Sequence, residues 1–404
     1  MNSSAVAASP SAVKIPSLAF PRLLRRIENT AYKPAERIPA LDGLRGVAIL
    51  LVLLRHSVAG TETTSTFWSA ILIPLRLTWS GVDLFFVLSG FLIGGILLDA
   101  RNSRRYFKTF YMRRAFRILP VYVVFILLYL GRHLPIPALV HFVGDTSRLP
   151  IPWLSFLTFT QNFWMVAFGW FGPMAIAPTW SLAVEEQFYL TIPFLIRRAG
   201  SATLYISLLL TIVSAPFLRA MLPHLITHGG FGCYVLMPCR ADALCMGVMA
   251  ALLVRNESCR VWITAHRWVL YVVTGLTFLG IPFLTYWAPE QYAPPMSTWG
   301  LTCLAIFYMS VLLSVICGNA PWIENLLTNP TLMKLGTLAY CTYLIHSIII
   351  EVFRSMIHAH SHLSPAEVWA SGGILGVMTA LSVASLSWKF FEQPFLRLGH
   401  RYTY

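Results

Sequence analysis

Charged residues are scarce in this chain. They make up 11% of its 404 residues, whereas about a quarter is usual in a soluble domain. Acidic residues are the rarer kind, with 16 Asp and Glu against 30 Lys and Arg, so the formal net charge is +14. The seven cysteines include no Cys-x-x-Cys pair, which argues against a zinc site and a disulfide framework. Hydrophobic residues make up 57% of the chain, and its mean hydropathy is +0.66. This composition predicts an all-α, polytopic membrane protein.

The N-terminal segment lacks an apolar run long enough for a signal peptide. It is rich in Ser, Ala and Pro and carries six Lys and Arg. We expect residues 1–37 to be a disordered, basic cytoplasmic tail. Residues 38–397 should form the membrane domain, and residues 398–404 a short cytoplasmic tail.

Apolar runs recur at lengths close to the roughly 20 residues that a membrane helix needs. The ten candidate spans are residues 42–58, 80–98, 118–131, 180–196, 202–221, 238–254, 268–286, 298–317, 335–353 and 367–388. A further apolar stretch, 151–171, is interrupted or flanked by Pro and Gly, which fits an irregular segment enclosed by protein. We expect that stretch to be re-entrant or to lie along the outer surface.

Lys and Arg gather in the segments between the spans, which is the pattern that orients membrane proteins. The expected loop 99–117 carries seven cations against the single acid Asp99. Ten spans, with both termini in the cytoplasm, place this loop and the other basic segments inside. An eleventh crossing at 151–171 would invert every later loop and is the alternative. Because the positive charge is explained by orientation, no nucleic-acid partner is expected.

Two ionisable residues, Arg45 and His56, belong to the first span. Their separation of eleven residues is close to three helical turns, so they share a face about 16 Å apart along the axis. Charged groups in membrane segments are costly and often mark a reaction site or a pathway. A neutral His56 is a competent general base, and Arg45 can bind phosphate or carboxylate. The alternatives are a histidine bonded between helices and an arginine that snorkels to the interface.

A second pair of cations precedes the third span. Arg114 and Arg117 are three residues apart and would face one side of a helix, where two guanidiniums can clamp a phosphate. An ordinary cytoplasmic basic loop also explains them.

Acidic residues in the spans provide candidate partners for these cations. Glu185 and Glu186 are adjacent, so they cannot face the same way, and one of them is expected to pair with His56 or Arg45. A purely structural ion pair is the alternative. Asp83 either orients His56 or caps its helix.

The remaining histidines are weaker candidates. His346 lies in the ninth expected span. His358, His360 and His362 alternate in what should be an outer loop. Their spacing implies no coordination geometry, so no metal site is expected.

Six motifs occur in the order found in the membrane acyltransferase-3 family, which the chain resembles from Ile38 to Arg397. That family includes O-antigen, exopolysaccharide and Nod-factor O-acetyltransferases and macrolide acyltransferases. The motifs are Leu-Asp-Gly-Leu-Arg-Gly followed by His56, Gly-Val-Asp-Leu-Phe-Phe-Val-Leu-Ser-Gly-Phe-Leu-Ile at 81–93, Arg-Ala-Phe-Arg-Ile-Leu-Pro at 114–120, Trp-Ser-Leu-Ala-Val-Glu-Glu-Gln-Phe-Tyr-Leu at 180–190, Tyr-Leu-Ile-His at 343–346 and Phe-Phe-Glu-Gln-Pro-Phe at 390–395.

The resemblance implies an integral-membrane O-acyltransferase. Its donor would be a cytoplasmic acyl-CoA, acting as co-substrate without a further cofactor, and its acyl group would most often be acetyl. The acceptor would be a hydroxyl of a glycan, lipid or secondary metabolite. The resemblance casts Arg45 and His56 as the functional pair of the first span. It also casts Arg114 and Arg117 as paired arginines, and it places Glu185 and Glu186 on an acidic motif.

Some family members append an extracytoplasmic hydrolase-like domain. This chain ends at Tyr404, so we expect no acetyl relay through such a module within this polypeptide. In the expected mechanism, His56 deprotonates the acceptor or briefly takes the acyl group, and Glu185, Glu186 or Asp83 orients it.

Two other classes of function remain open. Buried Arg, His, Asp and Glu can form the proton relay of a transporter or flippase that moves a glycan or lipid intermediate. The chain shows no matching pair of broken helices in two halves, which argues against that class. A catalytically silent scaffold is the third possibility, and His56 argues mildly against it.

Overall fold

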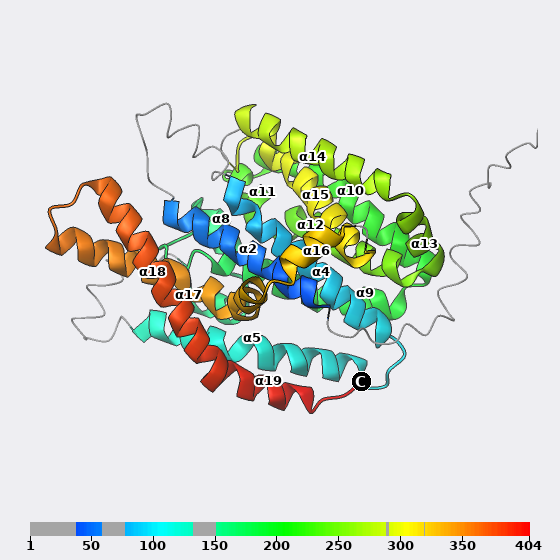
Figure 1. The fold of residues 1–404 in the computed structure, drawn as a ribbon, viewed down its shortest axis with the longest axis horizontal. Helices are drawn as coiled ribbons and strands as arrows, with labels where there is room; N and C mark the ends of the chain where they lie inside the picture. Colours follow the sequence, from blue (N-terminus) through cyan, green and yellow to red (C-terminus); the bar gives the residue numbers. More distant parts are fainter. Residues whose placement is uncertain (1–37, 59–76, 132–150, 288–290, 319) are drawn as a thin grey trace, which may run out of the picture.

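The structure, a computed structural model, describes residues 38–58, 77–131, 151–287, 291–318 and 320–404. Within these ranges the chain is helical and has no strand, so the predicted all-α class is confirmed. Figure 1 shows the long helices packed into one bundle. The basic tail predicted at residues 1–37 lies outside the described residues.

Among the described residues, ten long helices form this bundle. They are α2 (Pro39–Val58), α4 (Gly81–Asp99), α5 (Tyr106–Gly131), α9 (Thr179–Arg198), α10 (Ser201–Leu225), α12 (Met237–Arg255), α14 (Arg267–Trp287), α15 (Leu301–Ile316), α17 (Pro330–His360) and α18 (Pro365–Ser387). The shorter elements are η2 (Leu77–Ser80), α7 (Trp153–Leu157), α8 (Gln161–Phe168), α11 (Gly229–Val235), α13 (Glu257–Ala265), η3 (Met296–Gly300), α16 (Pro321–Leu327), η4 (Trp388–Glu392) and α19 (Gln393–His400).

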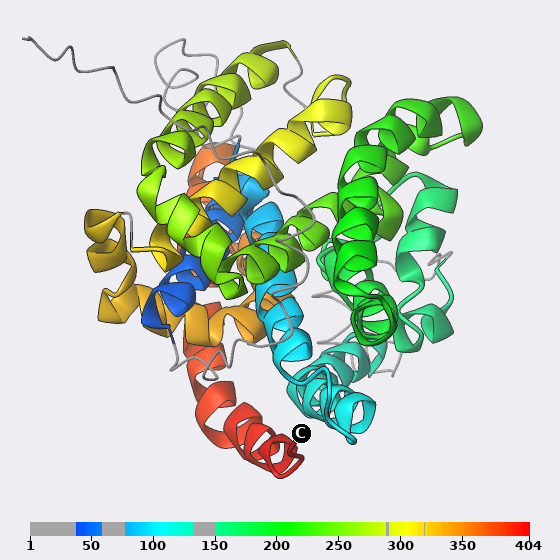
Figure 2. The ribbon, with the colours of Figure 1, turned by 90° about the vertical axis from the view of Figure 1, so that its right-hand side faces the viewer.

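Helices α2 and α4 occupy the middle of the bundle, as Figure 2 shows from the side. α2 packs against α17, and α4 packs against α12. In each pair of helices, the two backbones touch at a glycine. A Cβ atom on Gly336 of α17 would overlap the carbonyl oxygen of Asp42, and one on Gly90 of α4 would overlap that of Leu244. Small residues permit this close approach of membrane helices.

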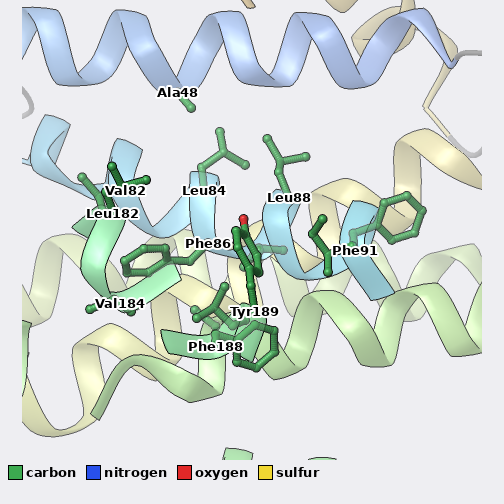
Figure 3. Close-up of a cluster of buried hydrophobic side chains, with 14 of the residues drawn as sticks. Ala48, Val82, Leu84, Phe86, Leu88, Phe91, Leu182, Val184, Phe188 and Tyr189 are labelled. Carbon is green, nitrogen blue, oxygen red and sulfur yellow. The ribbon is translucent and has the colours of Figure 1, made fainter. Parts of the chain in front are cut away.

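The core between α2, α4 and α9 is apolar. Figure 3 shows Leu84 and Leu88 of α4 pointing toward Ala48 of α2, while Phe86 lies on the side of α4 that faces α9. Leu84 and Leu88 share a face because they are four residues apart. α4 is therefore buried on both sides and forms a fixed wall for its neighbours.

Six helical segments in the described part of the chain are long and apolar enough to cross a membrane. They are Leu77–Asp99, Ser201–Leu225, Gly229–Arg255, Met296–Ile316, Pro330–His360 and Pro365–His400. The chain is a multi-pass membrane protein. The count of ten spans with both termini inside stays a prediction. α2, α5 and α9 are absent from the six, and they carry Arg45, the Arg114/Arg117 pair and the Glu185/Glu186 pair.

Several boundaries differ from those expected. The segment 106–117 is not a loop but the first half of α5, because its aromatic residues are spaced to pack on one helix face; only residues 100–105 connect α4 to α5. His358 and His360 belong to the last turn of α17 rather than to a loop. Among the described residues, no three metal-ligating side chains gather at one place.

The stretch 151–171 forms two short helices, α7 and α8, separated by residues 158–160. Neither reaches the length of about 20 residues that a crossing requires. The interruption by residues 158–160 agrees with an irregular segment, whereas its re-entrant or surface position and the alternative eleventh span stay predictions.

Candidate functional site

α2 is one unbroken helix that carries both Arg45 and His56. The two side chains therefore lie about 16 Å apart along its axis, as expected. Arg45 lies within reach of Asp42, one turn earlier, with 3.6 Å between Nη1 and Oδ1. The helix α2 thus has one end that carries Arg45, an apolar middle and another end that carries His56.

A cavity opens beside the Arg45 end of α2. Its empty volume is about 1030 Å³, part of which is open to the outside. The walls come from α2, α4, α5, α9, α17, η4 and α19. The charged residues that line it are Arg45, Arg114, Arg117, Glu185 and Glu392.

Three guanidiniums that are far apart in the sequence therefore meet in one place. Arg114 and Arg117 face the same side of α5, as their spacing predicted, and that side is the cavity. The guanidinium of Arg114 lies over the ring of Tyr189, 5.1 Å from its centroid. Positive charges held this close repel each other, so the arrangement favours an anion between them.

The two adjacent glutamates face different ways. Glu185 lines the cavity, where Arg114 and Arg45 are its charged neighbours and the hydroxyls of Ser89 and Tyr189 lie within hydrogen-bonding reach. Its neighbour Glu186 does not line the cavity, and its Oε1 is buried without a hydrogen-bond partner. The sequence predicts His56 or Arg45 as a partner for the pair, and the structure places Glu185 near Arg114 and Arg45.

Glu392 is a cavity residue to which sequence reasoning assigned no role. It is buried, it lies near Arg117, and it accepts a hydrogen bond from Ser387 at 3.2 Å. The π-helical turn η4 places it there, and such turns are frequent at functional sites. The sequence feature that could have indicated a role for Glu392 is its position as an acidic residue in an apolar segment, within the motif at 390–395.

His56 lies outside this cavity and contacts a second histidine. Its ring centroid is 4.6 Å from that of His346 on α17, and the planes are at 78°. Nδ1 of His56 lies 2.9 Å from the Val52 carbonyl oxygen. Because a carbonyl only accepts, Nδ1 carries the proton, and Nε2 has the free lone pair.

His346 has the same tautomer. Its Nδ1 lies 2.7 Å from the carbonyl oxygen of Tyr343, and its Nε2 lies 3.1 Å from Oγ of Ser347. The side chain is completely buried. From the sequence His346 is the weaker candidate, because no motif in the sequence shows that it lies close to His56.

Tyr343 stands between the cavity and the two histidines. It lines the cavity, its ring lies 5.8 Å from that of His346, and its hydroxyl is 2.6 Å from Oγ of Ser181 on α9. Tyr343 therefore lies between the arginines of the cavity and the two histidines.

Asp83 has a different partner from the one expected. Its Oδ1 accepts a hydrogen bond from Nη2 of Arg240 at 2.5 Å, and both side chains are buried. A buried carboxylate needs an opposite charge beside it, and Arg240 supplies that charge to Asp83. The structure thus pairs Asp83 with α12 rather than with His56.

Comparison with known proteins places the chain among acyltransferases. A family model described as an acyltransferase domain matches residues 38–387. A putative O-acetyltransferase of Staphylococcus aureus strain COL is 26% identical over 399 residues, which cover 92% of this chain and 59% of the relative. No solved structure matches significantly.

Two further relatives carry more specific names. The putative peptidoglycan O-acetyltransferase YrhL of Bacillus subtilis strain 168 is 28% identical, over 90% of this chain and 56% of the relative. The peptidoglycan O-acetyltransferase OatA of Listeria monocytogenes is 27% identical, over 92% and 58%. The chain thus spans less than two thirds of the length of these curated relatives. Because the family model covers most of its residues, this chain belongs to the acyltransferase family that the model describes.

Proposed function

We propose that this protein is an O-acyltransferase that moves an acetyl group from acetyl-CoA to a hydroxyl of a cell-envelope glycan. One observation carries the proposal: three arginines converge in a cavity at one end of α2, and His56, which contacts His346 of α17, lies about 16 Å further along α2. This separation suits a long donor with phosphates at one end and a thioester at the other. The names of the relatives support a glycan as acceptor.

The arginines would hold the donor. Phosphate oxygens accept charge-assisted hydrogen bonds from guanidinium groups, and Arg is suited to bidentate contacts. Arg45, Arg114 and Arg117 supply three positive charges against the carboxyls of Glu185 and Glu392. The carboxyls would keep the arginine side chains apart and oriented when the cavity is empty.

The histidine pair would carry out the proton transfer. Nε2 of His56 takes the proton of the acceptor hydroxyl as the oxygen attacks the thioester carbonyl. The C–S bond then breaks, and the departing thiolate receives that proton, which leaves an acetyl ester and free CoA. His346 fixes the ring of His56 through the edge contact between them. In a second route, Nε2 attacks the thioester carbonyl and the C–S bond breaks, which gives a short-lived acyl-histidine and CoA thiolate. The acceptor hydroxyl then attacks the acyl-histidine, the acyl–nitrogen bond breaks, and the hydroxyl proton passes to the thiolate.

The cytoplasm is the expected side of the donor, because the basic segments that orient the protein lie near the arginines in the sequence. The acceptor would then approach His56 from the other side. Tyr343 would separate the two substrates until the acyl group passes it.

The test uses membranes that contain the protein, radiolabelled acetyl-CoA and cell-wall glycan. Wild type is compared with His56→Ala and with His358→Ala, an exposed histidine on α17 that serves as a matched control. Label should enter the glycan with wild type and His358→Ala only. Equal label with His56→Ala would remove His56 from the mechanism.

The same membranes separate the proposal from a transporter or flippase. Movement of an unmodified glycan or lipid intermediate across sealed vesicles, without acetyl incorporation, would overturn the acyltransferase assignment. Membership of the acyltransferase family favours incorporation.

A further inference from the structure

A buried arginine on α17 contacts the end of α2 that carries His56. Arg354 is only 8% exposed. Its Nη2 donates hydrogen bonds to the carbonyl oxygens of His56 at 2.9 Å and of Ser57 at 3.0 Å. Both carbonyls belong to the last turn of α2. Carbonyls in the last turn of a helix have no partner within the helix, so a side chain that reaches them holds the turn in place.

Helix α18 holds the guanidinium in this position from the other side. The centroid of the Trp369 ring is 3.6 Å from Cζ of Arg354, which is a stacking contact. Gly372, one turn further along α18, leaves space for the arginine stem, because a Cβ atom there would lie 2.5 Å from its Cγ. The side chain of Arg354 is thus enclosed between α17 and α18 and points toward α2.

Burying the guanidinium of Arg354 costs free energy, and packing alone does not explain why the residue is there. The hydrogen bonds of Arg354 in the described part of the chain go to backbone carbonyls, and its Nε is buried without a partner. The acid near Arg354 is Glu351, an exposed residue one turn earlier on α17, and no salt bridge joins these two described residues. Burying a cation that is not directly paired with a carboxylate is unfavourable. The compensating feature is the C-terminal end of α2, where the aligned carbonyls favour a positive charge.

We propose that Arg354 is a positioning residue for His56. It fixes the last turn of α2 and thereby holds the imidazole against His346 with Nε2 available. The part of this inference that concerns turnover rests on the proposed acyltransferase function, whereas the part that concerns the position of His56 does not. Arg354 touches no substrate in this role.

The first experiment measures the position of His56 without any acyl transfer. Purified wild type, Arg354→Gln and Arg354→Lys are treated with diethylpyrocarbonate, and modification of His56 is followed by mass spectrometry, with exposed His358 as internal standard. Hydrogen exchange of residues 53–58 is measured in parallel. In Arg354→Gln, modification of His56 and exchange at the end of α2 should both become faster relative to the standard. Arg354→Lys keeps a donor and should be intermediate.

The control is Arg219→Gln. Arg219 is another fully buried arginine, and its partners are the carbonyls of Cys239 and Thr298 and the side chains of Asp242 and Thr302, away from α2. Loss of a buried cation should lower the unfolding temperature in both glutamine variants. Only Arg354→Gln should change the reactivity of His56. A change of equal size in Arg219→Gln would overturn the proposal by showing a general loosening.

The second experiment measures turnover. Misplacement of a reacting group by about 1 Å can cost about 100-fold in rate. In Arg354→Gln, kcat should therefore fall by up to that factor while KM for acetyl-CoA is unchanged, because the arginines at the other end of α2 are untouched. Arg354→Lys should recover part of kcat.

The outcomes separate the two proposals. Unchanged reactivity and exchange at His56 in Arg354→Gln would overturn the positioning role, whatever the activity. Altered reactivity of His56, with no acetyl transfer by folded wild type, would leave the positioning role standing and count against the acyltransferase function. A raised KM with constant kcat would assign Arg354 to donor binding and overturn the inference.

Discussion

The hydroxyl of Tyr343 and Oγ of Ser181 are 2.6 Å apart, and this hydrogen bond joins α17 to α9 at the end of the arginine-lined cavity nearest the histidines. It directly links the two walls at the point that an acyl group would have to pass under the proposed function. Under the proposed function, the size of the Tyr343 ring would limit which acyl groups can pass toward His56.

Replacing Tyr343 with Ala should therefore broaden the acyl groups that the protein transfers. Removing the ring opens space toward His346, so the ratio of butyryl to acetyl transfer should rise. Tyr343→Phe keeps the ring and loses only a hydrogen bond worth about 1 kcal/mol, so its preference should match wild type. Initial rates with acetyl-CoA and butyryl-CoA test this. An unchanged ratio in Tyr343→Ala would show that the ring is not the limit.

Arg117→Gln should weaken donor binding more than it slows the chemistry. A hydrogen bond to a charged group is worth about 1.5–3 kcal/mol, so KM for acetyl-CoA should rise about 10-fold or more while kcat changes less. Arg104→Gln, an exposed arginine in the connection between α4 and α5, is the matched control and should behave as wild type. A fall in kcat with KM unchanged in Arg117→Gln would place this arginine at the reacting atoms instead.

Gly336→Ala should destabilise the protein. The added methyl group overlaps the carbonyl oxygen of Asp42, so α2 and α17 must separate, and overpacking of this kind costs about 1–3 kcal/mol. Gly275→Ala on α14 is the control, because no atom lies within 4 Å of its added Cβ. That change should stabilise its helix by up to about 1 kcal/mol. Thermal unfolding in detergent compares the two, and equal unfolding temperatures would argue against the close contact.

Asp83→Asn should affect folding rather than chemistry. It leaves Arg240 buried without its counter-charge, which typically costs about 3–5 kcal/mol. Asp99→Asn breaks a more exposed pair with Arg255 and should cost about 0–1 kcal/mol. Yield and unfolding temperature should fall only in Asp83→Asn, and kcat per folded molecule should stay within a few-fold of wild type. A large loss of kcat in stably folded Asp83→Asn would restore the catalytic role that the sequence suggested.

The class of protein and the face shared by Arg45 and His56 were predictable, because helical periodicity and the cost of charge in a membrane act locally. The start of α5 was not, since a basic composition resembles a loop until its aromatic residues find a surface to pack on. The proximity of His56 to His346 depends on how α2 crosses α17, and that crossing depends on glycine contacts that no single motif encodes.

The partner of Asp83 and the place of Glu392 were not predicted, for a related reason. Asp83 had a plausible partner in His56 on the neighbouring helix in sequence, but the bundle brings Arg240 of α12 closer. Glu392 received no role because its helix enters the cavity only through the π-helical turn before α19. Tertiary packing decides which of several charged residues come into contact. A single sequence, taken on its own, does not reveal these contacts.

Helices α2 and α17 touch through their main chains at Gly46 and Gly336, where no side chains separate the two backbones. Side chains can change rotamer and let neighbouring helices slide, whereas two peptide backbones in contact have nothing to rearrange. We therefore expect these two helices, which carry Arg45, His56, Tyr343 and His346, to move as one rigid body. Rocking of one helix against the other, as in alternating access, is then not how substrates reach each other. Under the proposed function, the reacting groups would stay fixed while the donor and the acceptor move to them.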